Sequence, residues 1–159
     1  MINPGDEVVC IEPFFDAYKA QIVMAGGVPR YVPLQLKNDS SKSNSNQSKS
    51  CQDQRVDCDL LKKTINKRTK LLILNNPHNP SGKVFTPEEL AEVSDIVRPH
   101  KQLNVLADEV YEFLLYDGLQ HHRIANMPGM EDRVITVCSF GKTFSATGWK
   151  IGWAIAHPK

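Results

Sequence analysis

An uninterrupted apolar run near the middle of the chain, Leu71 to Leu74, constrains the fold more than any other feature. A strand with one face in water alternates apolar and polar residues, whereas a strand without alternation is covered on both faces. Such strands are typical of the interior of a parallel sheet. Parallel neighbours need long crossover connections, usually helices, so the run predicts an α/β fold with right-handed crossovers.

The rest of the chain supplies the other elements of such a fold. Thr86, Pro87 and Glu89 form an N-cap, a first-turn proline and a capping-box glutamate, and they predict a helix to about Val97. Pro33 predicts that its strand lies at a sheet edge, because proline cannot donate to a central ladder. In all, the predicted strands are 7–11, 30–36, 70–75, 104–107, 134–138 and 152–156. The other predicted helices are 15–24 and 59–65. The pattern predicts a doubly wound, mostly parallel sheet with helices on both faces.

One segment does not fit a packed domain. Residues 37–54 are rich in Ser, Asn, Lys and Gln, and Cys51 is their one apolar residue, so we expect a flexible surface insertion. The four cysteines lack zinc-site spacing and are expected to be free thiols in a reducing compartment, with a Cys51–Cys58 disulfide as the alternative. The adjacent pair His121-His122 is expected to be a solvated loop pair rather than a metal site.

Charge and hydropathy exclude several classes of function. The net charge is +1 and there is no basic block, so no nucleic-acid or membrane-surface partner is expected. The apolar runs are far shorter than the roughly 18–20 residues that a membrane span needs. The N-terminus has neither the basic region nor the apolar stretch of a signal peptide.

Polar side chains follow three of the predicted strands. Asn79 comes after the strand that ends at Asn75, Asp108 and Tyr111 follow the next strand, and Lys142 follows the strand that ends at Cys138. The carboxyl ends of parallel strands open onto one edge of a sheet, so these groups are expected to share a crevice. A lysine at such an edge can act as a Schiff-base nucleophile toward an aldehyde cofactor.

This set of side chains suits pyridoxal 5′-phosphate (PLP). An aspartate such as Asp108 can hold the pyridine nitrogen protonated, and an amide and a phenol can hydrogen-bond the ring oxygen. Ser139 and Lys150 can bind a phosphate.

Each residue also has an ordinary structural explanation when it is taken alone. Asp108 could cap a helix or turn, Tyr111 could be a core aromatic, and Asn79 could be a turn residue. Lys142 and Lys150 could be solvated surface lysines. Phe14 and Phe15 could both belong to the core.

Taken together, the motifs resemble the fold-type-I, class I/II PLP-dependent aminotransferases, and most closely the kynurenine aminotransferases. That group is also called glutamine transaminase K or cysteine-S-conjugate β-lyase. The motifs are Glu12-Pro13-Phe14-Phe15-Asp16-Ala17-Tyr18, Asn79-Pro80-x-Gly82, Ala107-Asp108-Glu109-Val110-Tyr111, Ser139-Phe140-Gly141-Lys142 and Gly148-Trp149-Lys150-Ile151-Gly152-Trp153.

The resemblance implies a role for seven positions. They are Lys142 as the Schiff-base lysine, Asp108 as partner of the pyridine nitrogen, Asn79 and Tyr111 as partners of the ring oxygen, Ser139 and Lys150 as phosphate ligands, and Phe15, with Phe14 as the alternative, as the aromatic ring stacked on the pyridine.

The resemblance also implies an activity and partners. The expected reaction transfers an amino group from an L-amino acid of the kynurenine or glutamine type to a 2-oxo acid, with β-lyase activity toward cysteine conjugates. Full-length members are expected to be homodimers, in the cytoplasm or the mitochondrion. Residues 1–159 are expected to be a partial PLP-binding large domain, without the family's N-terminal segment and without its C-terminal small domain, which carries the arginine for the substrate carboxylate.

Two alternatives stay open. The chain could be a truncated, non-catalytic PLP-binding or dimerising module. Ser139-x-x-Lys142 also matches the Ser-x-x-Lys of serine acylases, although neither Ser-Asp-Asn nor Lys-Thr-Gly follows it.

Overall fold

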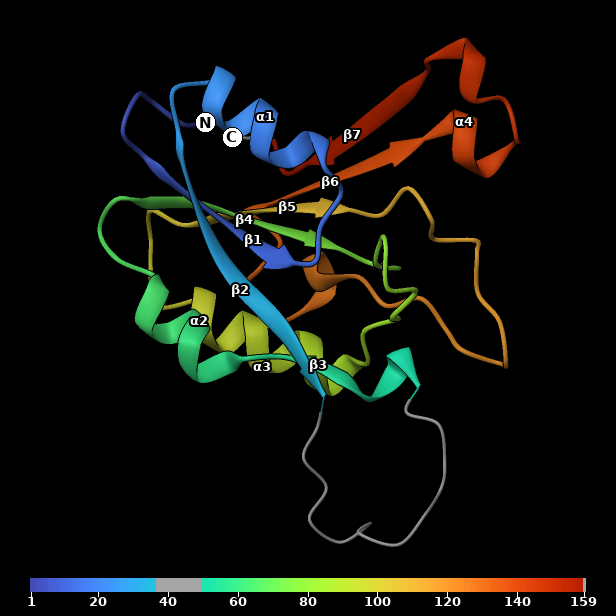
Figure 1. The fold of residues 1–159 in the computed structure, drawn as a ribbon, viewed down its shortest axis with the longest axis horizontal. Helices are drawn as coiled ribbons and strands as arrows, with labels where there is room; N and C mark the ends of the chain where they lie inside the picture. Colours follow the sequence, from blue (N-terminus) through green and yellow to red (C-terminus); the bar gives the residue numbers. More distant parts are fainter. Residues whose placement is uncertain (37–49, 159) are drawn as a thin grey trace, which may run out of the picture.

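The computed structural model describes residues 1–36 and 50–158, and these residues form one seven-stranded sheet (Figure 1). The strand order is β3-β2-β1-β4-β5-β6-β7. The five central strands, β2, β1, β4, β5 and β6, pair in parallel with one another. At the two ends of the sheet, β3 is antiparallel to β2 and β7 is antiparallel to β6. The strands are β1 (Glu7–Glu12), β2 (Val28–Leu36), β3 (Gln54–Val56), β4 (Thr69–Asn75), β5 (Asn104–Asp108), β6 (Val134–Ser139) and β7 (Gly152–Ala156).

Helices cover both faces of the sheet, as predicted. Figure 1 shows α1 (Ala17–Met24) on one side and α2 (Cys58–Thr64) with α3 (Pro87–Val97) on the other. Side chains of β1 alternate between the two layers because successive residues of a strand point to opposite faces. Val8 and Cys10 pack with Tyr18 and Ile22 of α1. Their neighbours on β1 belong to the larger cluster beneath α2 and α3.

The predicted elements lie close to the observed ones. Leu71 to Asn75 of β4 are all buried, which confirms that this strand is covered on both faces. The capping box of α3 is confirmed, because the Thr86 hydroxyl accepts a hydrogen bond from Glu89 N (3.3 Å) and the Glu89 carboxylate accepts one from Thr86 N (2.9 Å). Helix α1 begins at Ala17, two residues after the predicted start.

Two predictions about the second strand and the insertion need correction. The strand containing Pro33 is not simply the sheet edge, because β3 pairs with its last three residues, Leu34 to Leu36. The predicted insertion, 37–54, is too long at its C-terminal end. Cys51–Asp53 forms a 3₁₀ helix (η1) that runs directly into β3, and Ser50 caps it with a capping box. The remainder, 37–49, lies outside the described residues.

The edge strand β7 is unusual in its exposure. All five of its residues are exposed, including Trp153 and Ile155.

The four cysteines are free, and Cys10 and Cys138 are buried, in agreement with the prediction. None of the helices in the described ranges is long and apolar enough to cross a membrane.

Candidate active site

The carboxyl ends of β4, β5 and β6 lie side by side at one edge of the sheet. In the strand register, Asn75 is opposite Asp108, and Asp108 is opposite Val137. The loops that carry Asn79, Tyr111 and Lys142 therefore leave the sheet at neighbouring points. This is the edge at which doubly wound folds bind their ligands.

Asp108 is fixed by contacts on both of its carboxylate oxygens. The phenol of Tyr18, on α1, donates a hydrogen bond to Oδ2, and the backbone N–H of Val110 donates one to Oδ1 at 3.3 Å. Tyr18 is buried, and burial together with the Asp108 carboxylate raises the pKa of its phenol. The phenol therefore stays protonated and acts as a donor that orients the carboxylate.

Asn75 joins the Asp108 strand to the Asn79 loop. Its buried side-chain amide donates from Nδ2 to the carbonyl of Asp108 (2.8 Å), and its Oδ1 accepts from the backbone N–H of Asn79 (2.6 Å). Buried amides that bridge two backbone groups have few alternative arrangements, because leaving either group unpaired costs free energy. Asn79 itself is partly exposed.

The Lys142 loop has a tightly constrained backbone. Lys142 lies in the one-turn helix α4 (Phe140–Thr143), which is followed by the 3₁₀ helix η3 (Thr147–Trp149). A Cβ atom on Gly141 would be 2.7 Å from Thr147 Cα, so only glycine allows this approach. Ser145 and Lys150 have φ values of 52° and 54°, a region that non-glycine residues rarely adopt. Strained backbone of this kind is concentrated at functional sites.

Lys142 and Tyr111 lie next to each other although they follow different strands. The exposed Lys142 Nζ is 5.8 Å from the centre of the Tyr111 ring. Phe15 is 45% exposed and packs edge-on against Tyr18, with ring centres 5.7 Å apart, whereas Phe14 stacks on Tyr31.

The two candidate phosphate ligands lie at opposite ends of the Lys142 loop but at the same end of the sheet. Ser139 ends β6 and is paired with Gly152 of β7. The N–H of Phe140 donates to the carbonyl of Ile151 (3.1 Å), which closes the loop beside Ser139 and Lys150. The side chain of Lys150 is exposed.

Comparison with known proteins shows the family. The model of the aminotransferase class I and II family matches residues 1–159. The chain belongs to this family. A kynurenine–oxoglutarate transaminase from Dictyostelium discoideum is 49% identical over 156 residues. That alignment covers 98% of this chain and 36% of the relative. The chain therefore spans about a third of the length of the curated relatives that it matches.

Solved aminotransferase structures share the fold. N-succinyldiaminopimelate aminotransferase from Mycobacterium tuberculosis is 39% identical, with a TM-score of 0.85, and the match covers 99% of this chain and 37% of that one. Cystalysin from Treponema denticola, whose crystal structure contains a PLP cofactor, is 25% identical with a TM-score of 0.84. That match covers 98% of this chain and 36% of cystalysin.

The donor set of this chain fits PLP. An exposed primary amine lies beside a phenol, and an aspartate held by a protonated phenol lies on the neighbouring strand. These are the groups needed for an aldehyde carbon, a ring oxygen and a pyridinium nitrogen. Among the residues described, the structure brings Lys142 and Tyr111 into contact, and hydrogen bonds link Asn75 to both Asn79 and Asp108.

Sequence reasoning missed Tyr18 and Asn75, which act on the site through other residues. Tyr18 had a signal in the sequence, because in the predicted helix 15–24 it lies three residues after Phe15 and therefore on the same side. Asn75 had a weaker one, since it ends a strand and directly follows the apolar run Leu71 to Leu74.

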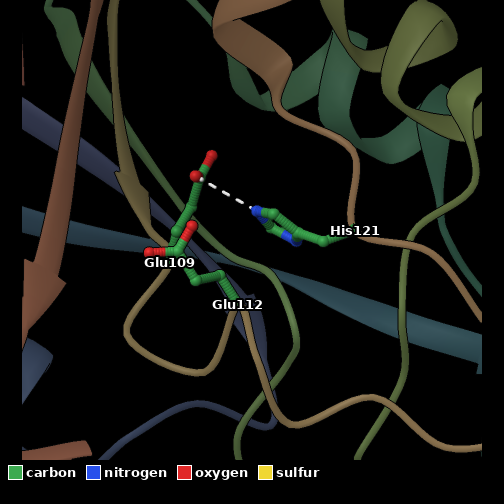
Figure 2. A group of neighbouring side chains, drawn as sticks. All are labelled: Glu109, Glu112 and His121. Carbon is green, nitrogen blue, oxygen red and sulfur yellow. Dashed lines mark hydrogen bonds and ion pairs between the residues drawn. The ribbon is translucent and has the colours of Figure 1, made fainter. Parts of the chain in front are cut away.

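A second group of residues was also missed. Glu109 and Glu112 are buried, and Arg123 donates to Oε2 of both carboxylates, with an Nη1–Oε2 distance of 2.7 Å to Glu109. Figure 2 shows the His121 ring pointing at Glu109, with Nε2 3.2 Å from Oε2. The side chain of His121 is only 10% exposed, so the predicted solvated His121-His122 pair is wrong for His121. The prediction failed because the acidic partners lie 9 to 12 residues earlier in the chain.

Proposed function

We propose that the protein is a PLP-dependent aminotransferase that acts on L-amino acids of the kynurenine or glutamine type and on 2-oxo acids. The observation that carries this proposal is the contact of Lys142 with Tyr111 beside the register that aligns Asn75, Asp108 and Val137. The 49% identity to a kynurenine–oxoglutarate transaminase supports the substrate class.

Each residue would have a different role in such a site. When it is bound, PLP supplies an electron sink for the carbanion at the substrate α-carbon. Asp108 would hold a proton on the pyridine nitrogen, and Asn79 and Tyr111 would donate to the ring oxygen. The amine of Lys142 would bind the aldehyde carbon and, once free, would move the α-proton.

The remaining contacts would orient the cofactor. Ser139 and Lys150, at the two ends of the Lys142 loop, would bind the phosphate, and the half-exposed ring of Phe15 would cover the pyridine. The expected homodimer and β-lyase activity are part of this proposal for the whole protein.

Cofactor binding can be tested before turnover. The chain would be incubated with PLP, reduced with borohydride, digested and examined by mass spectrometry for a pyridoxyl group on Lys142. Lys142→Arg, which keeps the charge but cannot form the linkage under these conditions, is the matched control. Absence of the adduct from the wild-type chain at saturating PLP would overturn the proposed site.

A second candidate function is a PLP-binding module without catalysis. The exposure of every residue of β7 favours it. Turnover of kynurenine with 2-oxoglutarate separates the two. An adduct on Lys142 with turnover supports the aminotransferase, whereas an adduct without turnover supports the module.

A further inference from the structure

Two kinds of residue occupy adjacent positions at the end of β5 and in the turn that follows it. Asp108 and Tyr111 belong to the candidate cofactor site, whereas Glu109 and Glu112 are buried and contact Arg123. Each member of one pair is followed directly in the chain by a member of the other. Any contact that fixes the two glutamates therefore also restricts the backbone of the cofactor-facing residues.

The backbone of this turn is short and hydrogen-bonded. Glu109 N donates to Val137 O (2.9 Å), and Glu112 N donates to Glu109 O (3.0 Å). Leu114 N then donates to Tyr111 O at 2.8 Å. These bonds make the turn a single hydrogen-bonded unit between β5 and the exposed residues that follow it. A displacement of either glutamate therefore also displaces the backbone of the neighbouring residues.

Two buried carboxylates in one turn need a partner of opposite charge. Glu109 is 1% exposed and Glu112 is 9% exposed, and an unpaired carboxylate at such depth is strongly unfavourable. The planar guanidinium of Arg123 donates a hydrogen bond from Nη1 to Glu109 and one from Nη2 to Glu112. It therefore fixes the spacing of the two carboxylates as well as neutralising their charge. His121 makes a third contact, to Glu109.

A metal ion would be a weaker explanation of the same cluster. Ligand-type atoms of Glu109, Glu112 and His121 lie within 4.8 Å of one another, as a cation site would require (Figure 2). Arg123, however, already donates to Oε2 of both carboxylates. A cation there would have to displace a guanidinium of like charge from these oxygens, so the geometry favours an ion-pair cluster.

We propose that Arg123 is a positioning residue for the cofactor site: by holding the carboxylates of Glu109 and Glu112, it fixes where Asp108 and Tyr111 lie. This inference rests on the proposed function for its consequence, PLP affinity. Its structural part, the order of the turn, does not depend on PLP.

The test compares two variants that each remove an arginine from a buried glutamate. Arg123→Gln releases Glu109 and Glu112. Arg30→Gln removes one of the two arginines paired with buried Glu7. Glu7 is the first residue of β1, so it lies at the amino-terminal ends of the parallel strands, away from the candidate site. Amide hydrogen exchange of residues 108–112, measured without PLP and normalised to global stability, is the first readout. PLP affinity, measured by titration, is the second.

In Arg123→Gln we expect exchange of the turn to be about tenfold faster than in Arg30→Gln and PLP binding to be about tenfold weaker. Arg123→Lys, which keeps the charge but not the two-pronged geometry, should restore only part of the protection. If Arg123→Gln does not fold, Glu112→Gln, which removes the charge of one of the two carboxylates, should shift exchange in the same direction. Equal exchange of the turn in the Arg123 or Glu112 variant and the Arg30 variant overturns the inference. Failure of the wild-type chain to bind PLP would count against the proposed function alone.

Discussion

The phenol of Tyr18 donates a hydrogen bond to the carboxylate of Asp108, across 90 residues of sequence. It joins helix α1 to the end of β5, and it connects the layer on one face of the sheet to the candidate cofactor edge. Phe15, expected to cover the pyridine ring, packs edge-on against the same tyrosine. Tyr18 therefore supports two of the residues that would contact the cofactor.

Tyr18→Phe should weaken the site without changing the packing of α1. The substitution keeps the ring beside Phe15 and removes only the donor to Asp108. Hydrogen bonds to charged groups contribute about 1.5–3 kcal/mol, so we expect unfolding free energy to fall by about 2 kcal/mol in urea denaturation. Tyr31→Phe, whose ring stacks on Phe14 at the surface, is the control and should change stability by less than about 0.5 kcal/mol. Equal stability of the Tyr18 variant and the wild type would contradict the role given to this bond.

Asn75 offers a second test, because its amide has a separate donor and acceptor. Asn75→Ala removes the partners of Asn79 N and Asp108 O and should cost about 2–4 kcal/mol. Asn75→Asp keeps the acceptor but places a carboxylate against the Asp108 carbonyl. We expect both variants to lower PLP affinity in a fluorescence titration. The prediction is wrong if Asn75→Asp binds PLP as tightly as the wild type.

Much of this fold could be predicted from the sequence because its signals are local. The apolar run of β4 and the Thr86-Pro87-Glu89 cap each specify an element from a few adjacent residues, and both are confirmed. Strand β3 could not be found in this way. It has three residues, all partly buried, and two of them, Gln54 and Arg55, are polar. Only its pairing with β2 makes it a strand.

The candidate site divides along the same line. Motif residues such as Lys142 and Asp108 were named because they follow predicted strands, and the parallel register then places them at one edge. Arg123 was not identified and His121 was expected to be solvated, because an ion pair with a buried carboxylate is recognised only once both partners are known. Their partners on the turn after β5 are brought close by a chain reversal that no periodicity indicates.

The lowered pKa of His78, in the loop that carries Asn79, predicts that the stability of the fold decreases at acidic pH. His78 is buried, its Nδ1 lies 2.8 Å from the Ser81 hydroxyl, and burial, with a smaller effect of Lys83, lowers its pKa from 6.5 to about 4. The unfolded chain binds a proton near pH 6.5, whereas the folded chain resists protonation until about pH 4. Stability is therefore fully present above pH 6.5 and falls as the pH decreases through this window, by up to about 3 kcal/mol.

Urea denaturation at pH 7.5, 6, 5 and 4.5 would measure this loss. His78→Gln removes the titrating group and should flatten the pH dependence over this window. His157→Gln changes an exposed histidine and should leave the wild-type slope intact. Retention of the full slope by His78→Gln would assign the pH dependence to other groups.

Gln52 provides the last test, because it lies within the segment first predicted to be a flexible insertion. Its side chain brackets the loop after Asn79: Nε2 donates to the carbonyl of Gly82 (3.0 Å), and Oε1 accepts from Val84 N (2.9 Å). Lys83, between these two residues, is buried and pairs with Glu89 of α3 at 2.9 Å. Gln52 of η1 therefore fixes the two residues that flank Lys83, whose ammonium group pairs with α3.

Gln52→Ala should release this loop while leaving the sheet intact. We expect unfolding free energy to fall by about 1–2 kcal/mol, because two backbone groups lose their partner. Limited proteolysis should show faster cleavage near residues 79–84. Gln102→Ala, which removes a single hydrogen bond to the carbonyl of Asn66, is the matched control and should leave that cleavage rate unchanged. Unchanged cleavage in Gln52→Ala would mean that the ion pair between Lys83 and Glu89 holds the loop without help from η1.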